Sequence, residues 1–479
     1  MIRYICCFIF FFSILLSDVR ANPFLELTLP DAPSDSAEKL IINEIVIAGN
    51  KITRRNIIER EIMLPVNQPL DKVKLEEQIL LSKNNLMNTG LFNVVKIEYV
   101  KDEFNYIKLL VLVTERWYIW PFPILQIADR NFNTWWLTKD LSRLNYGLFL
   151  VYANFRGRKE TIVLRGQMGF TKQLGLAYNV PYIDKKQRNG LSFSMNYAEN
   201  NQVIIRTVNN KTEFLRNYSN NIRNEIYGSL TFTHRQSFFD THSLSAKYNS
   251  IFVTDTVLKI NPYYLSRLSK NQVQYLTLDY IYRFDKRDYK PYPLKGHYFE
   301  LEAVKYGLGI LHNESDVDVF FVTGNVRKYW KLSERWHYAG SLKFKASSTS
   351  FQPFYFVRGL GYNDFVRGFE YYNFDGQNFT LAKNNIKYTL VKPKTIKVFE
   401  GSENPFSSIY YAFYLNLFAD IGKVYDRQTI NDNIKSSQYL SSVGLGLDWL
   451  GSYDRVFRFE TAYNSFGQLG FYIHFSSPI

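Results

Sequence analysis

Cysteine and long hydrophobic runs are both scarce in this sequence. The two cysteines, Cys6 and Cys7, lie within the apolar stretch 4–16 near the start of the chain. After residue 20 there is no apolar run of about 18 residues, the length that a membrane-spanning helix requires. We therefore predict a chain that depends on no disulfide and crosses no membrane by a helix.

The first residues have the pattern of an export signal. Arg3 precedes the apolar stretch, and Val19 and Ala21 stand where a signal cleavage site needs small residues. The sequence predicts a signal peptide over residues 1–21, whose removal would take both cysteines with it. An N-terminal membrane anchor is the alternative, although the stretch is short for spanning. Residues 22–39 are polar and contain proline, as expected of a linker.

Motifs for catalysis and for metal binding are also missing. None of the 6 histidines falls in an H-E-x-x-H pattern or beside a cysteine, and no G-x-S-x-G or phosphate-binding glycine loop occurs. Asp285 and Asp288 could form an acid and base pair, but aspartates at this spacing are typical of a hairpin turn. We predict no enzyme, no catalytic residue, no metal site and no cofactor.

The net charge of +14 is dispersed among aromatic residues and forms no basic cluster. A strongly basic chain often binds nucleic acid. Dispersed charge on an exported chain is better suited to lipid phosphates. We expect contact with outer-membrane lipids and no nucleic-acid partner.

Residues 40–115 have the pattern of one small α/β domain. A short apolar strand is followed by two segments with helical spacing at 53–62 and 71–90. Thr53 and Asp71 are candidate N-caps of these helices, and Gly90 is the stop signal. Segments 91–100 and 106–115 then have the composition of strands.

After residue 115 a period of two replaces the helical period. Apolar residues alternate with small or polar ones in about sixteen segments of roughly ten residues, separated by polar loops. One apolar face consists of Val443, Leu445, Leu447 and Trp449. Lipid cannot satisfy the backbone groups of a sheet edge, so this pattern predicts a membrane all-β fold, a closed transmembrane β-barrel over 116–479. A soluble sandwich or propeller is the alternative, and the export signal and 17% aromatic content disfavour it.

Several segments resemble the outer-membrane protein assembly factor superfamily, the BamA/TamA-like and bacterial surface antigen proteins. Residues 85–100 (NLMNTGLFNVVKIEYV) resemble part of a POTRA domain, the periplasmic module of this family. Residues 283–300 (RFDKRDYKPYPLKGHYFE) resemble a barrel segment, and 364–372 (DFVRGFEYY) match the family's (V/I)RG(F/Y) motif. Residues 418–426 (FADIGKVYD) resemble its Phe-x-Asp-x-Gly strand. The resemblance implies one POTRA domain at 40–115, in the periplasm, before a barrel in the bacterial outer membrane.

In this family the motif loop lies between the eleventh and twelfth strands and folds back into the barrel lumen. The resemblance assigns the loop to residues 349–379 and the motif to Val366, Arg367, Gly368 and Phe369. The arginine is expected to pair with Asp420 on the lumen wall, because a guanidinium matches the planar geometry of a carboxylate. The preceding Arg358 is a candidate for a second contact.

The family's barrel turn motif is expected at Asp285, Arg287, Asp288, Pro293 and Gly296. Two features depart from the family pattern. Only one POTRA domain can be recognised, and Gly-Ser-Tyr-Asp-Arg at 451–455 replaces the Gly-Pro turn that is common between the last barrel strands. These departures leave the function within the family open.

Three functions are compatible with the sequence. The resemblance favours an outer-membrane assembly or translocation factor, whose partners would be unfolded outer-membrane proteins or a secreted client, together with accessory lipoproteins. A two-partner secretion pore and a passive outer-membrane channel are the alternatives. For the first function we expect strand 43–49 or strand 106–115 to offer a free sheet edge to an extended client segment.

Overall fold

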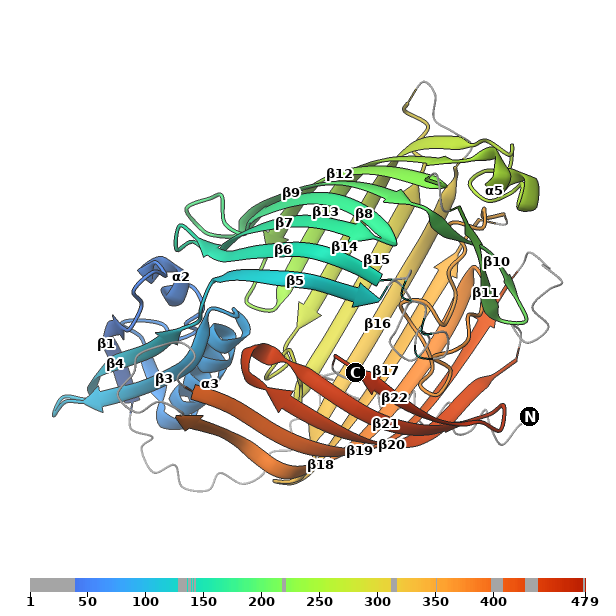
Figure 1. Cartoon of the computed structure of the whole chain (residues 1–479). Helices are drawn as coiled ribbons and strands as arrows, with labels where there is room; N and C mark the ends of the chain where they lie inside the picture. Colours follow the sequence, from blue (N-terminus) through green and yellow to red (C-terminus); the bar gives the residue numbers. More distant parts are fainter. Residues whose placement is uncertain are drawn as a thin grey trace, which may run out of the picture.

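The computed structural model describes residues 39–127, 136, 139, 141, 144–217, 221–311, 317–349, 351–397, 408–426, 438–476 and 479. The expected signal peptide, and the linker except residue 39, lie outside these residues. The described chain forms a small α/β unit followed by a large antiparallel sheet (Figure 1). Among the described helices, none is long and apolar enough to span a membrane.

The N-terminal unit is a 4-stranded sheet with the order β2-β1-β4-β3. Its elements are β1 (Lys39–Ala48), α2 (Arg55–Glu59), β2 (Pro69–Asp71), α3 (Lys72–Asn88), β3 (Phe92–Lys101) and β4 (Tyr106–Glu115). β1 and β4 run parallel, while β3 and β4 are antiparallel. The sequence pattern predicted these elements except the short β2.

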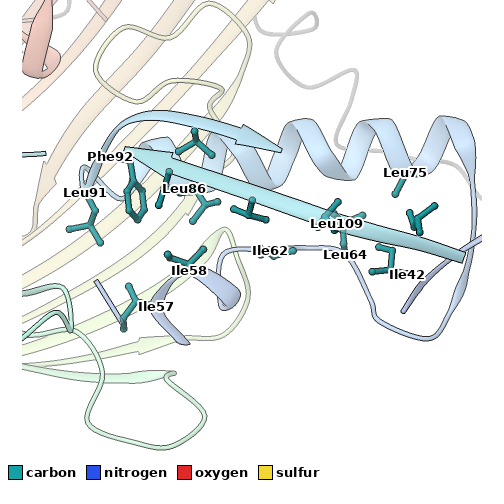
Figure 2. Close-up of a cluster of buried hydrophobic side chains, with 14 of the residues drawn as sticks. Ile42, Ile57, Ile58, Ile62, Leu64, Leu75, Leu86, Leu91, Phe92 and Leu109 are labelled. Carbon is teal, nitrogen blue, oxygen red and sulfur yellow. The ribbon is translucent and has the colours of Figure 1, made fainter. Parts of the chain in front are cut away.

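The core of this unit is apolar, with α3 packed on the sheet. Ile58, Leu75 and Leu109 are each 0% exposed and belong to one cluster (Figure 2). Gly90 ends α3 as expected, with a φ of +74° that favours glycine. Thr53 is not the N-cap of α2: the cap is Arg54, and no side chain caps this helix.

One of the two strands expected to offer a free edge is an internal strand. β4 lies between β1 and β3, so the expectation for 106–115 is wrong. A proline at Val111, which is 0% exposed, would remove a bond inside the sheet and unfold the domain. The edge strand on this side is β3. β1 pairs with β2 only over Lys39–Ile41, so its remaining residues lie along the opposite edge.

The second part of the chain confirms the predicted barrel fold as a 16-stranded sheet in which neighbours along the chain pair antiparallel. The first strands are β5 (Ile119–Ile127), β6 (Leu144–Phe155), β7 (Glu160–Gly169), β8 (Thr171–Val180), β9 (Asn189–Asn200), β12 (Arg223–Arg235), β13 (Asp240–Val253) and β14 (Gln272–Asp285). The others are β15 (Gly296–Tyr306), β16 (Val319–Lys331), β17 (Trp336–Ser347), β18 (Asn378–Lys397), β19 (Ser408–Tyr425), β20 (Leu440–Gly451), β21 (Val456–Asn464) and β22 (Leu469–His474).

Shorter elements lie outside the barrel sheet. β10 (Gln202–Val208) and β11 (Lys211–Arg216) form a separate hairpin between β9 and β12. The short helix α5 (Asp255–Ile260) follows β13, and the one-turn 3₁₀ helix η2 (Ser452–Asp454) connects β20 to β21. The hairpin and α5 lie at the end of the barrel opposite the α/β unit (Figure 1).

The barrel strands have apolar outer faces and polar inner faces. On β20, Val443 and Leu445 are 56% and 60% exposed, whereas Ser442 and Asp448 are 5% and 0% exposed. This alternation matches a sheet with lipid on one side and a filled lumen on the other. It follows the period of two seen in the sequence.

The expected closed ladder is not completed among the described residues. The sheet order begins at β22 and ends at β5, and no backbone pairing joins these two strands in the described part of the chain. Two features of the strands account for this. β5 contains Pro121 and Pro123, which have no N–H to donate, and β22 has only 6 residues.

Candidate functional site in the barrel lumen

The loop that carries the arginine motif fills part of the barrel lumen. It spans residues 348–377 and joins β17 to β18, the eleventh and twelfth strands of the sheet. Val366 and Phe369 are each 1% exposed and pack in one apolar cluster with Leu381 of β18 and Val424 of β19. An extracellular loop in water would leave such side chains exposed, so the burial reflects the inward fold.

Arg367 and Asp420 form a bidentate pair at the centre of this site. Nε of Arg367 donates to one carboxylate oxygen of Asp420 at 2.8 Å, and Nη2 donates to the other at 2.5 Å. The backbone N–H of Arg367 adds a third bond to the same carboxylate, at 3.2 Å. Both side chains are almost completely buried, at 1% and 0% exposed. The contact anticipated from the sequence is present, and Asp420 faces the lumen.

Other lumen groups surround the guanidinium of Arg367. Its Nη2 also donates to Asn385 Oδ1 at 2.7 Å, and its Nη1 lies 3.5 Å from a carboxylate oxygen of Glu460. The ring of Phe418 stacks beneath it, with 3.9 Å between the ring centroid and Cζ. Two carboxylates and one aromatic face thus compensate a single buried cation.

Gly368 allows the motif to turn against the barrel wall. Its φ is +87°, and a Cβ at this position would lie 3.1 Å from the Cβ of Ala462. The Gly368 carbonyl accepts hydrogen bonds from Asn464 Nδ2 at 2.6 Å and from the Tyr472 hydroxyl at 3.2 Å. Any larger residue would meet both a strained backbone and a close neighbour.

The motif loop has further anchors on both of its limbs. Glu370, 1% exposed, lies 3.2 Å from Nε2 of His474 on β22. Arg358 contacts no carboxylate directly among the described residues; its Nη1 donates to the carbonyls of Phe354 and Val357 at 3.0 and 2.7 Å. Arg358 therefore stabilises the fold of the loop itself.

The β10–β11 hairpin contacts the loop at the end of the barrel opposite the α/β unit (Figure 1), a contact that the sequence did not predict. The N–H of Asn373 in the loop donates to the carbonyl of Asn210 at 2.8 Å, and Asn210 Nδ2 donates back to the carbonyl of Asn373 at 3.2 Å. Asn209 and Asn210 have φ values of 52° and 60°. Two adjacent asparagines are a hairpin-turn signal that could have located the turn, though not its contact.

The predicted turn motif lies at the opposite end of the barrel, between β14 and β15. Asp285 accepts two bonds from Arg287, at 2.7 and 2.9 Å, and Asp288 accepts the N–H of Leu294 at 3.1 Å. Gly296 has a φ of +114° and could accommodate no Cβ. Pro293 is buried within the turn. The arrangement is that of a structural turn, as expected from the sequence.

The α/β unit contacts the barrel rim through a buried ion pair. Arg235, which ends β12, donates to both carboxylate oxygens of Glu61 at 2.7 and 2.8 Å. Glu61 is only 3% exposed. Burial by itself would raise the pKa of this carboxyl, but the hydrogen bonds and charge of Arg235 outweigh it and lower the pKa to about 2.

Two further contacts connect the unit with barrel turns. The N–H of Arg54 donates to the carbonyl of Gly157 at 2.9 Å, in the turn between β6 and β7. Asn88 at the end of α3 donates to the Asp288 carbonyl at 3.1 Å and accepts the N–H of Lys290 at 2.9 Å. The α/β unit is therefore docked at several points of the rim.

Comparison with known proteins decides the family. The model of the Omp85 superfamily domain matches residues 154–465, which is more than half of the chain. The chain belongs to the Omp85 superfamily. The POTRA model, described as a surface antigen variable number repeat, matches residues 40–116, so the α/β unit is a POTRA domain. No curated protein sequence shows a significant match.

Solved structures of other Omp85 proteins share the fold. BamA from Haemophilus ducreyi lacking POTRA domains 1–3 is 16% identical, with a TM-score of 0.50, over 91% of this chain and 84% of that one. CdiB from Escherichia coli is 10% identical, with a TM-score of 0.51, over 94% of this chain and 93% of that one. Family membership identifies a bacterial outer-membrane protein with a periplasmic POTRA domain, among proteins of outer-membrane assembly and translocation.

The described part of this Omp85 protein offers no obvious place for a metal ion. It contains no group of three or more His, Cys, Asp or Glu side chains that could hold one. Arg367 of the loop pairs with Asp420 and lies near Glu460 on the barrel wall, an arrangement that holds the loop in place.

Proposed function

We propose that this protein is an outer-membrane assembly or translocation factor that inserts or moves β-barrel proteins, or other substrates, into or across the outer membrane. The observation that supports this proposal is the combination of a docked POTRA domain with a lumen that is occupied by an anchored loop. The POTRA domain would receive unfolded outer-membrane proteins or a secreted client. Outer-membrane lipids and accessory lipoproteins would be further partners.

A passive channel fits this geometry less well. Diffusion of small solutes needs an open, water-filled lumen, whereas here Arg367 and Phe369 are buried deep inside it, at 0% and 1% exposed. A passive pore also has no use for a periplasmic domain docked by a buried ion pair. The proposed role of the Arg367–Asp420 pair is to keep the motif loop in the lumen during client handling.

Depletion of the protein from its own cells tests the proposal. Quantitative proteomics of the outer membrane should show the loss of many barrel proteins if the chain inserts them. Loss of a single secreted protein would instead identify a dedicated secretion pore. Reduced uptake of small solutes with an unchanged outer-membrane proteome would overturn the proposal.

Complementation of the depleted cells connects the phenotype to the site. Wild-type protein should restore the outer-membrane proteome, and Arg367→Glu should not. The matched control is Arg206→Glu in the exposed Arg206–Glu213 pair, whose side chains are 52% and 45% exposed. If both variants complement equally, the motif has no part in the function.

A further inference from the structure

The turn at 451–455, which departs from the family pattern, contacts the far side of the barrel seam. Arg116 lies where the chain leaves the POTRA domain, just before β5. Its Nη1 and Nη2 donate to the two carboxylate oxygens of Asp454 at 2.7 and 3.1 Å. The hydroxyl of Tyr289, from the turn between β14 and β15, donates to the same carboxylate. Asp454 thus receives donors from two separate elements.

Aromatic contacts extend this link along β5. The rings of Tyr453 and Trp120 meet edge to face, with 4.9 Å between centroids and an interplanar angle of 79°. Cζ of Arg455 lies 5.5 Å from the ring centroid of Phe122. Three consecutive residues of the turn therefore contact the start of the first barrel strand or the residue that leads into it. Figure 1 shows β5 and the β20–β21 hairpin at the same end of the barrel, next to the POTRA domain.

The backbone of this turn is strained. Tyr453 has φ and ψ of 57° and 35°, and Asp454 has a φ of 63°. Side chains other than glycine rarely adopt this left-handed region, and an aromatic residue is among the least suited to it. A turn that only joined two strands would be more stable with glycine. The strain at Tyr453 indicates that its side chain is needed where this conformation places it.

The outward edge of β5 offers few backbone donors of its own. The N–H of Ala153 in β6 donates to the carbonyl of Tyr118 at 2.8 Å, so even-numbered residues of this segment direct their backbone groups toward β6. The backbone groups of odd-numbered residues point to the opposite edge of β5, because successive residues of a strand alternate in direction. Pro121 and Pro123 are odd-numbered, so this edge lacks two N–H groups. A continuous backbone ladder across the seam is impossible at these positions.

We infer that residues 451–455 are a clasp that holds the two ends of the barrel sheet together at the periplasmic side, with Asp454 as its positioning residue. The clasp uses side chains where the prolines prevent backbone pairing. It also fixes the exit of the POTRA domain through Arg116, so docking of the domain and closure of the seam are coupled. This inference does not depend on which client the protein handles.

Hydrogen–deuterium exchange of the full chain in lipid nanodiscs tests the clasp. The readout is exchange in peptides covering β5, because opening of the seam exposes this strand. Asp454→Asn keeps the shape and removes the charge, and should raise β5 exchange by about tenfold, the factor expected for one lost charge-assisted contact. Asp454→Glu, which retains the charge, should raise it less. The matched control is Asp279→Asn, which breaks the ion pair between Lys247 of β13 and Asp279 of β14 in the middle of the sheet and should leave β5 exchange unchanged.

Tyr453→Gly separates a clasp from a simple turn. Glycine relieves the backbone strain, so a purely connecting turn would be stabilised and β5 exchange would stay the same or fall. A clasp would lose its contact with Trp120, and β5 exchange would rise although the turn itself is relaxed. Unchanged exchange in both Tyr453→Gly and Asp454→Asn, or an equal rise in Asp279→Asn, would overturn the inference.

Discussion

The POTRA domain and the barrel bury opposite kinds of side chain. In the POTRA domain the fully buried residues include Ile58 and Leu75, which belong to one apolar cluster. In the barrel, Arg367 and Asp448 are at 0% exposed while Leu445 faces outward at 60%. Water surrounds the first unit and lipid the second, so apolar burial stabilises the POTRA domain, whereas ion pairs and hydrogen bonds organise the barrel interior.

Because of this contrast, replacing a buried residue destabilises the two regions for different reasons. Loss of an apolar group in the POTRA core leaves a cavity. Loss of one partner of a lumen ion pair leaves an uncompensated buried charge. The following variants test the contrast, beginning with the largest expected effect.

Arg367→Glu should be the most damaging single change in the barrel. It places a third carboxylate beside Asp420 and Glu460, and breaking a buried pair typically costs about 3–5 kcal/mol. The measurement is the temperature at which the folded barrel, which migrates fast on a gel when it is not boiled, converts to the slowly migrating unfolded form. Adding Asp420→Arg should restore part of the loss. If Arg206→Glu, on the surface, lowered this temperature equally, the burial of the lumen pair would be irrelevant.

Leu109→Ala should destabilise the POTRA domain by about 2–5 kcal/mol, because Leu109 is 0% exposed in its core. Proteolysis of the POTRA domain within the full chain, followed across a urea series, reports this change. The matched variant is Leu445→Ala on the outer barrel face, which should leave POTRA proteolysis unaltered and change barrel stability less. Equal effects of the two variants would contradict the assignment of an apolar core to one region only.

Leu445→Arg should cost about 2–4 kcal/mol if the residue lies near the bilayer midplane. The comparison is Val73→Arg on α3, where the apolar side chain is 82% exposed, but to water. That change should alter stability by no more than about 0.5 kcal/mol. Both are read from denaturant unfolding in lipid vesicles. Tolerance of Leu445→Arg would show that this face does not contact lipid.

The smallest effect is expected for the docking of the POTRA domain on the barrel rim. In the wild-type chain, docking should weaken only in strong acid. The pKa of Glu61 falls from 4.5 to about 2 in the folded chain, so its stabilising contribution is complete above the unfolded value and declines as the pH drops toward 2. Protease release of the domain from the barrel rim measures docking. Glu61→Gln should weaken docking at neutral pH, where the wild-type carboxylate is charged, and should remove the acid dependence. Loss of docking near neutral pH in the wild-type chain would contradict the role of this pair.

Local patterns were sufficient to predict much of this structure. The alternation around Val443 and Leu445 predicted strands with one lipid face, and the resemblance of residues 364–372 located the motif loop. Asp420 was identified from a short strand pattern because the family places a carboxylate there. The contact between Asp420 and Arg367 also requires the loop to fold into the lumen. No local pattern in this sequence predicts that inward fold.

Long-range contacts escaped prediction for a different reason. Asn210 and Asn373 are far apart in the chain, and no pattern in either segment predicts that the two residues form hydrogen bonds. β4 was expected at a sheet edge because its apolar run looks the same in an edge strand as in a central strand. Thr53 resembled a helix cap, but the barrel junction at Tyr118, whose hydroxyl lies 3.0 Å from its Oγ1, decided its role.

By itself, the sequence determined the period of each segment, and with it the division into a small α/β domain in water and strands in lipid. The backbone must satisfy its hydrogen bonds in either solvent, and side-chain periodicity records which solvent each face meets. Tertiary structure alone decided which elements meet: the loop against Asp420, the POTRA domain against Arg235, and the turn at 451–455 against β5. Such contacts depend on the register and curvature of the whole 16-stranded sheet, which are set by many weak pairings together and by no single segment.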